Sequence, residues 1–153
     1  MQPTKLVIAS ILKPVDDTRM YEKFAKTLVQ TKKYEINIIG FWSKKSPAIS
    51  NIIQHPIFKF KRLSIRRWFA SILYYRVLIK LKPAILIVTT HELLPASIVY
   101  KAFYPSRVIY DVRENYYRNI KYLNTYPAIV KDLLAIWVRC KETLAARFID
   151  HFI

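Results

Sequence analysis

Uninterrupted apolar runs alternate along the chain with segments in which apolar residues recur every three or four positions. The run "KLVIAS" (Lys5–Ser10) is apolar without alternation, which is typical of a strand that is covered on both faces. In the next segment, Asp17–Lys32, the residues Met20, Phe24 and Leu28 recur at fourfold spacing. That spacing predicts a helix with one apolar face.

The same alternation continues to the end of the chain. We expect further strands at Tyr34–Phe41, Pro56–Phe60, Ala84–Thr90 and Arg107–Val112, and further helices at Ser64–Lys82, Leu93–Phe103 and from about Pro127. The closing run "FIDHFI" is a possible sixth strand. This order predicts an α/β fold: a Rossmann-like, doubly wound, mainly parallel sheet with helices on both faces.

The last predicted helix carries an apolar stripe that we expect to pack on the sheet. Its members span about 120° of a helical wheel, and they are Val130, Leu133, Leu134, Trp137, Cys140, Leu144 and Phe148. Cys140 would then be a buried structural thiol rather than a nucleophile.

Length and composition fit one domain. The chain has 153 residues, of which 53% are hydrophobic, enough for a core. A single cysteine excludes an internal disulfide and fits a reducing compartment. The early apolar run is too short for a signal peptide and lacks a cleavage site, so we expect a cytoplasmic protein. Because the chain stops inside an apolar run, we also expect residues 1–153 to be a fragment or a domain that normally continues.

Positive charge is the strongest compositional signal. Twenty-six Lys and Arg face ten Asp and Glu, which gives a formal charge of +16, and no acid lies between Glu35 and Glu92. Such a surface attracts phosphates on lipids, nucleic acids or substrates, although it can also be a merely solvated face. The predicted helix Ser64–Lys82 lies in this region, too apolar for an ordinary surface helix and too short and charged to span a bilayer.

The candidate functional residues follow the strands, because ligands bind such sheets beyond the carboxyl ends of the strands. The polar segments there are "ILKPVDDTRMYEK", "THELL" and the loop "RENYYRN". Gly40 is the only glycine, which excludes the glycine-rich motif for dinucleotides and the P-loop. The histidines His55, His91 and His151 lack the spacing of a metal site, so we expect none.

Three groups of residues are open to more than one interpretation. His91 and Glu92 are either a substrate contact and proton carrier or the flank and first turn of a helix. Asp111 and Glu114 are candidate acid–base carboxylates, but neighbouring arginines favour ion pairs that hold the loop. Phosphate recognition and structural salt bridges are equally open for Arg19, Arg113 and Arg118.

The segments "KPVDDTRMYEKFAKTL", "YEINIIGF", "KPAILIVTTHELLPA" and "VIYDVRENY", taken in order, resemble a known family. They are similar to the N-terminal half of GT-B-fold glycosyltransferases, in particular the group-4-like bacterial enzymes of polysaccharide and lipopolysaccharide assembly. The resemblance covers nearly the whole chain. Relatives often have histidine where this chain has Arg113 and a glycine-rich turn where it has "KPVDD". The role that this histidine has in relatives is therefore not expected at Arg113. The replacement of the glycine-rich turn by "KPVDD" implies a different contact with the acceptor.

The resemblance implies a domain that binds a glycan or lipid-linked acceptor and does not transfer sugar alone. The nucleotide-sugar donor would bind a second, C-terminal domain, so we expect no cofactor in this chain. The implied acceptor-binding residues are Asp17, Arg19, His91, Glu92, Arg113, Asn115 and Arg118, with His91, Asp111 and Glu114 as catalytic candidates.

Several enzymes of this type resemble monotopic proteins that dock on the inner face of the cytoplasmic membrane. The implied contact with anionic lipid is made by Lys61, Arg62, Arg66, Arg67, Trp68 and Phe69. The alternative is a non-catalytic basic module for nucleic acid or a partner protein; nucleic acid is disfavoured because strands buried on both faces leave no aromatic platform. A flavodoxin-like regulatory domain has less support.

Overall fold

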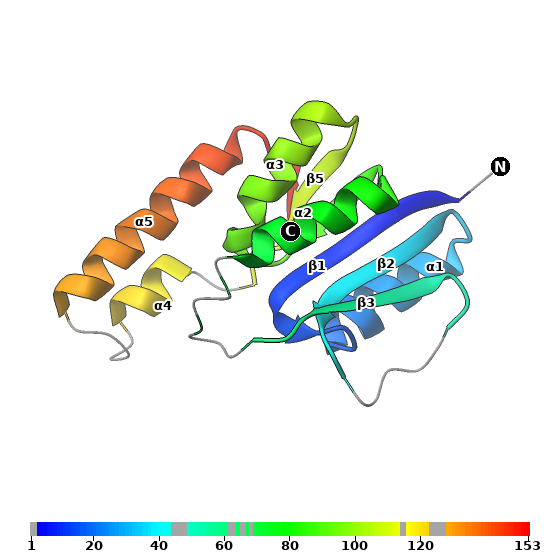
Figure 1. Ribbon diagram of the computed structural model, residues 1–153, viewed down its shortest axis with the longest axis horizontal. Helices are drawn as coiled ribbons and strands as arrows, with labels where there is room; N and C mark the ends of the chain where they lie inside the picture. The colour runs from blue at the N-terminus through cyan, green and yellow to red at the C-terminus, as the bar shows by residue number, and fades with distance from the viewer. Residues whose placement is uncertain are drawn as a thin grey trace.

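Six parallel strands form one sheet in the order β3-β2-β1-β4-β5-β6 in the computed structural model (Figure 1). The strands are β1 (Thr4–Pro14), β2 (Tyr34–Phe41), β3 (Ile52–Phe58), β4 (Ile85–Val88), β5 (Arg107–Tyr110) and β6 (His151–Phe152). The structure describes residues 3–43, 49–60, 64, 67, 69–113, 116–122 and 128–153. The predicted α/β fold with a Rossmann-like parallel sheet is confirmed.

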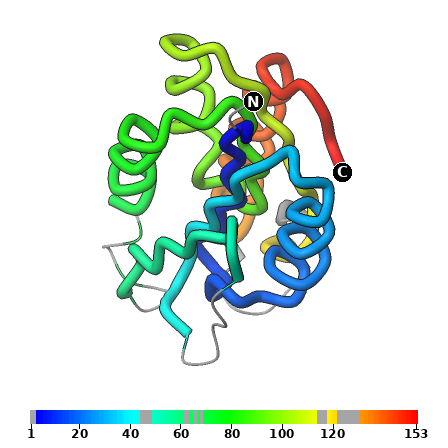
Figure 2. The backbone as a smooth tube through the Cα atoms, turned by 90° about the vertical axis from the view of Figure 1, so that its right-hand side faces the viewer, coloured from blue at the N-terminus to red at the C-terminus, as the bar shows by residue number. Residues whose placement is uncertain are grey.

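Helices cover both faces of this sheet. They are η1 (Thr18–Ala25), α1 (Lys26–Gln30), α2 (Ala70–Leu81), η3 (His91–Leu93), α3 (Leu94–Phe103), α4 (Tyr116–Tyr122) and α5 (Ala128–Ala146). Figure 2 shows η1 and α1 on one side of the strands and α2 on the other. In Figure 1, α4 and α5 extend beyond the end of the sheet at which β1 finishes, which is its carboxyl edge.

The apolar run of β1 is buried on both faces, as its lack of alternation predicted. Val7 and Ala9 belong to the core beneath α2 and α3, whereas Leu6 and Ile8 belong to the core beneath η1. Because successive side chains of a strand point to opposite faces, β1 connects the two cores. It lies between β2 and β4 at the centre of the sheet.

The predicted helix Asp17–Lys32 is present, but its first part is a π-helix. The Asp17 side chain caps it, with Oδ1 accepting hydrogen bonds from the backbone N–H groups of Arg19 and Met20 at 3.2 Å each. The α-helical part covers only Lys26–Gln30. This cap fixes Asp17 and Arg19 directly after the bend that follows β1.

The prediction for the packing face of α5 was wrong. Leu133, Trp137, Leu144 and Phe148 are exposed, and Cys140 is exposed instead of buried. The opposite side of the helix is buried, through Ala135, Val138 and Ala145, with Ile149 just beyond its end. The buried side of α5 carries small side chains, which let the helix pack closely against the domain. The pattern of large apolar residues does not show which side of the helix is buried.

Two other details differ from the sequence prediction or refine it. The possible sixth strand is present as β6, which pairs with β5 in parallel. The segment expected to be a loop after β5 is partly helical, because α4 begins at Tyr116. Arg118 and Asn119 therefore lie on a helix.

Candidate functional site

A network of two arginines and two aspartates joins the ends of β1 and β5. Arg19 Nη2 lies 2.5 Å from Asp111 Oδ1, and Arg113 Nε lies 3.1 Å from Asp111 Oδ2. Arg113 Nη1 lies 2.8 Å from Asp17 Oδ1, which also caps η1. The Asp111 side chain is 0% exposed, so it is a buried carboxylate held between two guanidinium groups.

The backbone after β5 fixes this network in place. The Asp111 N–H donates to the Val88 carbonyl at 2.8 Å, and the Val112 N–H donates to the Ile153 carbonyl at 2.8 Å. Two donors, Arg19 Nε and Arg113 Nη2, are buried without a hydrogen-bond partner among the described residues. Because a guanidinium carries five N–H donors, the network has more donors than its carboxylates satisfy.

A second cluster lies at the end of β4, around His91 and Glu92. Glu92 Oε1 forms an ion pair with Arg67, and the Ser71 hydroxyl donates to the Glu92 carbonyl at 2.6 Å. His91 Nε2 lies 3.5 Å from Glu92 Oε2, and His91 Nδ1 lies 3.4 Å from Lys141 Nζ. Four charged or titratable side chains from three separate segments thus meet beside η3.

The His91 ring is neutral at physiological pH. Burial lowers its pKa from 6.5 to about 4, an effect that the nearby Glu92 carboxylate only partly opposes. An ammonium group can only donate, so Nδ1 must accept from Lys141 and the ring proton must sit on Nε2, facing Glu92. Burial also lowers the pKa of Lys141.

Helix α5 crosses the carboxyl edge next to both strands. Lys141 contacts His91, which follows β4, and Glu142 accepts a 2.7 Å hydrogen bond from the hydroxyl of Tyr110, the last residue of β5. The ring of Trp137 lies 5.3 Å from Lys141 Nζ. Lys141 and Glu142 were not among the residues predicted from the sequence, because no local pattern reveals which residues of a distant helix return to this edge.

The structure thus brings together some predicted residues and separates others. Asp17, Arg19, Asp111 and Arg113 form one network, and His91 and Glu92 lie in the other cluster. The ion pairs described above each lie within one of these two sets. Arg118 is exposed on α4. The predicted residues Lys61, Arg62, Arg66, Trp68, Glu114 and Asn115 lie outside the described residues.

The other two residues predicted to face a membrane are described. Arg67 turns toward Glu92 and takes part in the His91 cluster. Phe69 is 58% exposed just before α2. No described helix has the length and apolar character needed to cross a membrane. Within the described parts of the chain, no three His, Cys, Asp or Glu side chains are grouped so that they could hold a metal ion.

Comparison with known proteins supports the fold. Neither a protein-family model nor a curated protein sequence matches the chain. Among solved structures it is similar to a sucrose-phosphate synthase from Thermosynechococcus elongatus, a GT-B glycosyltransferase, with a TM-score of 0.56 and 7% sequence identity. The match covers 89% of this chain but only 39% of the synthase. At this identity the likeness shows the fold alone: a Rossmann-like α/β domain.

Proposed function

We propose that this chain is the acceptor-binding domain of a nucleotide-sugar-dependent glycosyltransferase and is not catalytic alone. The glycosyltransferase-like fold and the resemblance of "KPVDDTR", "THELL" and "YDVRENY" to group-4-like enzymes favour this class. In the proposal the acceptor is a glycan or a lipid-linked glycan of polysaccharide or lipopolysaccharide assembly. The donor sugar is held by a second domain.

The observation that carries the proposal is the arginine–aspartate network at the carboxyl edge. Arg19 and Arg113 are fixed by Asp17 and Asp111, so their geometry does not depend on a ligand. Preorganised guanidinium donors beside carboxylate acceptors match the hydroxyl groups of a sugar, which both donate and accept. The crevice beyond parallel strands is where α/β sheets bind ligands.

The proposal is tested by nuclear magnetic resonance titration of the ¹⁵N-labelled chain with neutral oligosaccharides. We expect the largest shifts at the side-chain Nε–H of Arg19 and Arg113, and no release of sugar from a nucleotide-sugar donor by the chain alone. Arg113→Lys keeps the charge but removes the fork of donors, and should weaken binding by about tenfold. Arg107→Lys is the matched control at the exposed start of β5. If no glycan perturbs these arginines, the acceptor assignment is wrong.

The proposal includes docking of α2 on an anionic membrane surface, which would place the protein at the inner face of the cytoplasmic membrane. Exposed apolar and basic residues share the outer face of this helix, and they are Phe69, Ile72, Leu73, Arg76, Ile79 and Lys80. Buried Ala70, Tyr74 and Leu78 hold the opposite face on the core. A helix with apolar residues flanked by cations is suited to lie in the interface of an anionic bilayer.

A further inference from the structure

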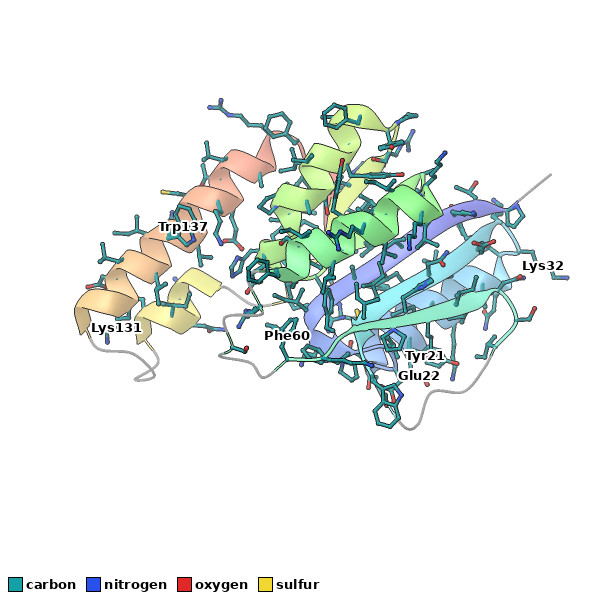
Figure 3. The ribbon with its side chains drawn as sticks, in the orientation of Figure 1. Tyr21, Glu22, Lys32, Phe60, Lys131 and Trp137 are labelled. Carbon is teal, nitrogen blue, oxygen red and sulfur yellow. The ribbon has the colours of Figure 1, made fainter. Side chains whose placement is uncertain are left out.

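The exposed side of α5 carries most of the apolar stripe that the sequence analysis singled out. Leu133 is 65% exposed, Trp137 is 53% exposed and Leu144 is 66% exposed, and Cys140 between them is exposed as well. Figure 3 shows Trp137 in the middle of the helix. We call these four residues the α5 seam. It is an apolar surface that none of the described elements covers.

The spacing within the α5 seam is typical of a helix that pairs with another helix. Its members follow one another at intervals of four, three and four positions, which is the spacing of apolar residues in coiled coils. Helix α5 has 19 residues and is therefore about 28 Å long, which is enough for about three turns of such a contact. An exposed seam of this kind favours a helix as its partner.

A second copy of α5 that runs antiparallel fits this seam. With a two-fold axis between positions 138 and 139, Leu133 of one copy lies opposite Leu144 of the other. In the same register Trp137 lies opposite Cys140, so a large ring faces a small side chain, as in well-packed layers. A parallel pair would instead place Trp137 against Trp137, which overfills one layer and leaves the next one, Cys140 against Cys140, underfilled.

The charges beside the α5 seam are complementary in this antiparallel register. Asp132 and Arg147 are exposed and lie on the same flank of the seam, Asp132 near the start of the helix and Arg147 just after its end. In a two-fold antiparallel pair each flank meets the same flank of the other copy, so Asp132 lies beside the other copy's Arg147 at both ends. The interface then has an apolar centre and a charged rim, as protein interfaces usually do.

The size of this surface is sufficient for a weak dimer. Two helices that pair over the length of α5 bury on the order of 1,000 Å² in total, which is the lower limit for a specific interface. The formal charge of +16 on each chain opposes association, but much of it lies in the acid-free stretch between Glu35 and Glu92 and not on α5. We therefore expect a dissociation constant in the micromolar range.

We propose that two copies of this chain form a two-fold symmetric dimer through antiparallel pairing of the α5 seam. The partner at this surface is thus a second copy of the same helix. The inference does not depend on the proposed acceptor-binding function, because it uses neither the arginine–aspartate network nor the outer face of α2.

Sedimentation equilibrium of the full chain tests the proposal. We expect a monomer–dimer equilibrium that tightens at least threefold as ionic strength rises from about 0.1 M to about 1 M, because the Debye length shortens from about 10 Å to about 3 Å and the repulsion between the two chains weakens. A chain that remains monomeric at about 1 mM overturns the proposal.

Substitutions on the two exposed helices locate the interface. Leu133→Ser with Leu144→Ser should weaken the dimer at least tenfold, because apolar area is lost from its centre. Ile72→Ser with Leu73→Ser on α2 is the matched control and should stay within twofold of the parent. Loss of the dimer in the α2 variant instead would place the interface on α2 and overturn the proposal.

Charge reversal tests the antiparallel register. Asp132→Arg places two arginines together at each end of the pair and Arg147→Asp places two aspartates together, so each should weaken the dimer at least threefold. Arg147→Asp also lowers the net charge, so weaker association of this variant cannot come from overall repulsion. The double substitution reverses both ion pairs and should return to within twofold of the parent. A double variant that stays as weak as the single ones contradicts the antiparallel arrangement.

Cys140 reports the contact directly, because it is the only cysteine of the chain. In the proposed pair the two Cys140 residues lie close together, on helices with axes about 8–10 Å apart. A short bismaleimide should therefore yield a covalent dimer of the parent. Cys140→Ser with Ile72→Cys moves the thiol to α2 and should yield none. Circular dichroism checks each fold, and sedimentation of the parent decides the question even if a variant does not fold.

A lipid surface is the other occupant that the experiments separate. At concentrations below the dissociation constant, the two α5 substitutions should leave vesicle binding through α2 unchanged. A parent chain that stays monomeric while the α5 variant loses binding to anionic vesicles would assign this face to lipid, and the dimer would be wrong.

Discussion

The buried carboxylate of Asp111 accepts hydrogen bonds from two arginines, one of which lies 92 residues away in the sequence. The local sequence indicated that neighbouring arginines would pair with Asp111, and Arg113 does so. For Arg19, phosphate recognition and a structural salt bridge were equally open, and no local pattern linked it to Asp111. Parallel strands bring their carboxyl ends to one edge, which explains why residues after β1 and β5 meet.

At the scale of this residue, we expect Asp111→Asn to destabilise the fold strongly. The amide keeps the shape but presents N–H donors to guanidinium groups, leaving buried charge unpaired, so the free energy of unfolding should fall by about 3–5 kcal/mol. Urea denaturation measures this change. Glu22→Gln removes a carboxylate from the exposed pair with Lys26 and should change stability by less than about 1 kcal/mol. Similar effects of the two substitutions would contradict a structural role for the network.

His91 provides a pH-dependent contribution to stability. Its pKa is lowered by burial from 6.5 to about 4 in the folded state, so between these values the unfolded chain binds more protons than the folded chain. Stability should therefore fall as pH decreases from 6.5 to about 4, by up to about 3 kcal/mol. Urea denaturation across this range measures the slope.

The control for this titration is His91→Asn, which keeps an acceptor near Lys141 without a titratable ring. This variant should show a smaller slope, though some slope should remain because burial also lowers the pKa of His55. His151→Asn at an exposed position of β6 is the matched substitution and should follow the parent. An unchanged slope in His91→Asn would show that the ring does not titrate in this window.

At the scale of elements, the spacing of apolar residues predicted which segments form strands and helices, but not always which side of a helix is buried. The strands β1, β2, β4 and β5 follow from apolar runs, because strands covered on both faces need no alternation. Helix α5 has apolar residues on two opposite sides, so its pattern suits either packing face. The side with Ala135 and Ala145 is the buried one because it packs against the rest of the domain, and this packing is a tertiary property. The contacts of Lys141 and Glu142 depend on that packing and could not be predicted.

The end of α2 offers a test at this scale. Lys82 follows the last helical residue with φ at 51°, in the left-handed region that favours glycine, and its N–H donates to the Leu78 carbonyl at 2.8 Å. Lys82→Gly should raise the free energy of unfolding by about 0.5–1 kcal/mol. Lys80→Gly, inside the helix, should lower it by about 1 kcal/mol. Denaturation curves of the pair should therefore move in opposite directions; a shift in the same direction contradicts the assigned helix end.

At the scale of the whole molecule, positive charge and exposed apolar surface occur together. The chain carries a formal charge of +16, and both α2 and α5 expose large apolar residues on a face that includes or adjoins basic ones. The carboxyl edge bears the two clusters of ionic side chains. In our proposal α2 contacts the lipid and the carboxyl edge of the sheet binds the sugar. The two functions can therefore be tested with separate substitutions.

Binding to lipid vesicles tests which of the two helices with exposed apolar residues, α2 or α5, contacts the membrane. We expect the chain to bind anionic vesicles, to bind neutral vesicles more weakly, and to dissociate as salt shortens the Debye length. The double substitution Ile72→Ser and Leu73→Ser removes apolar area from α2 and should weaken binding at least tenfold in a flotation assay. Arg76→Gln should weaken it about fivefold, since a cation near an anionic surface contributes about 1 kcal/mol.

The matched double substitution is Leu133→Ser and Leu144→Ser on the exposed side of α5. This variant loses apolar area of the same kind, so it should retain vesicle binding if α2 is the docking helix. Loss of binding in the α5 variant alone would move the membrane contact to α5, beside Trp137. Equal binding to neutral and anionic vesicles would contradict the electrostatic part of the membrane proposal.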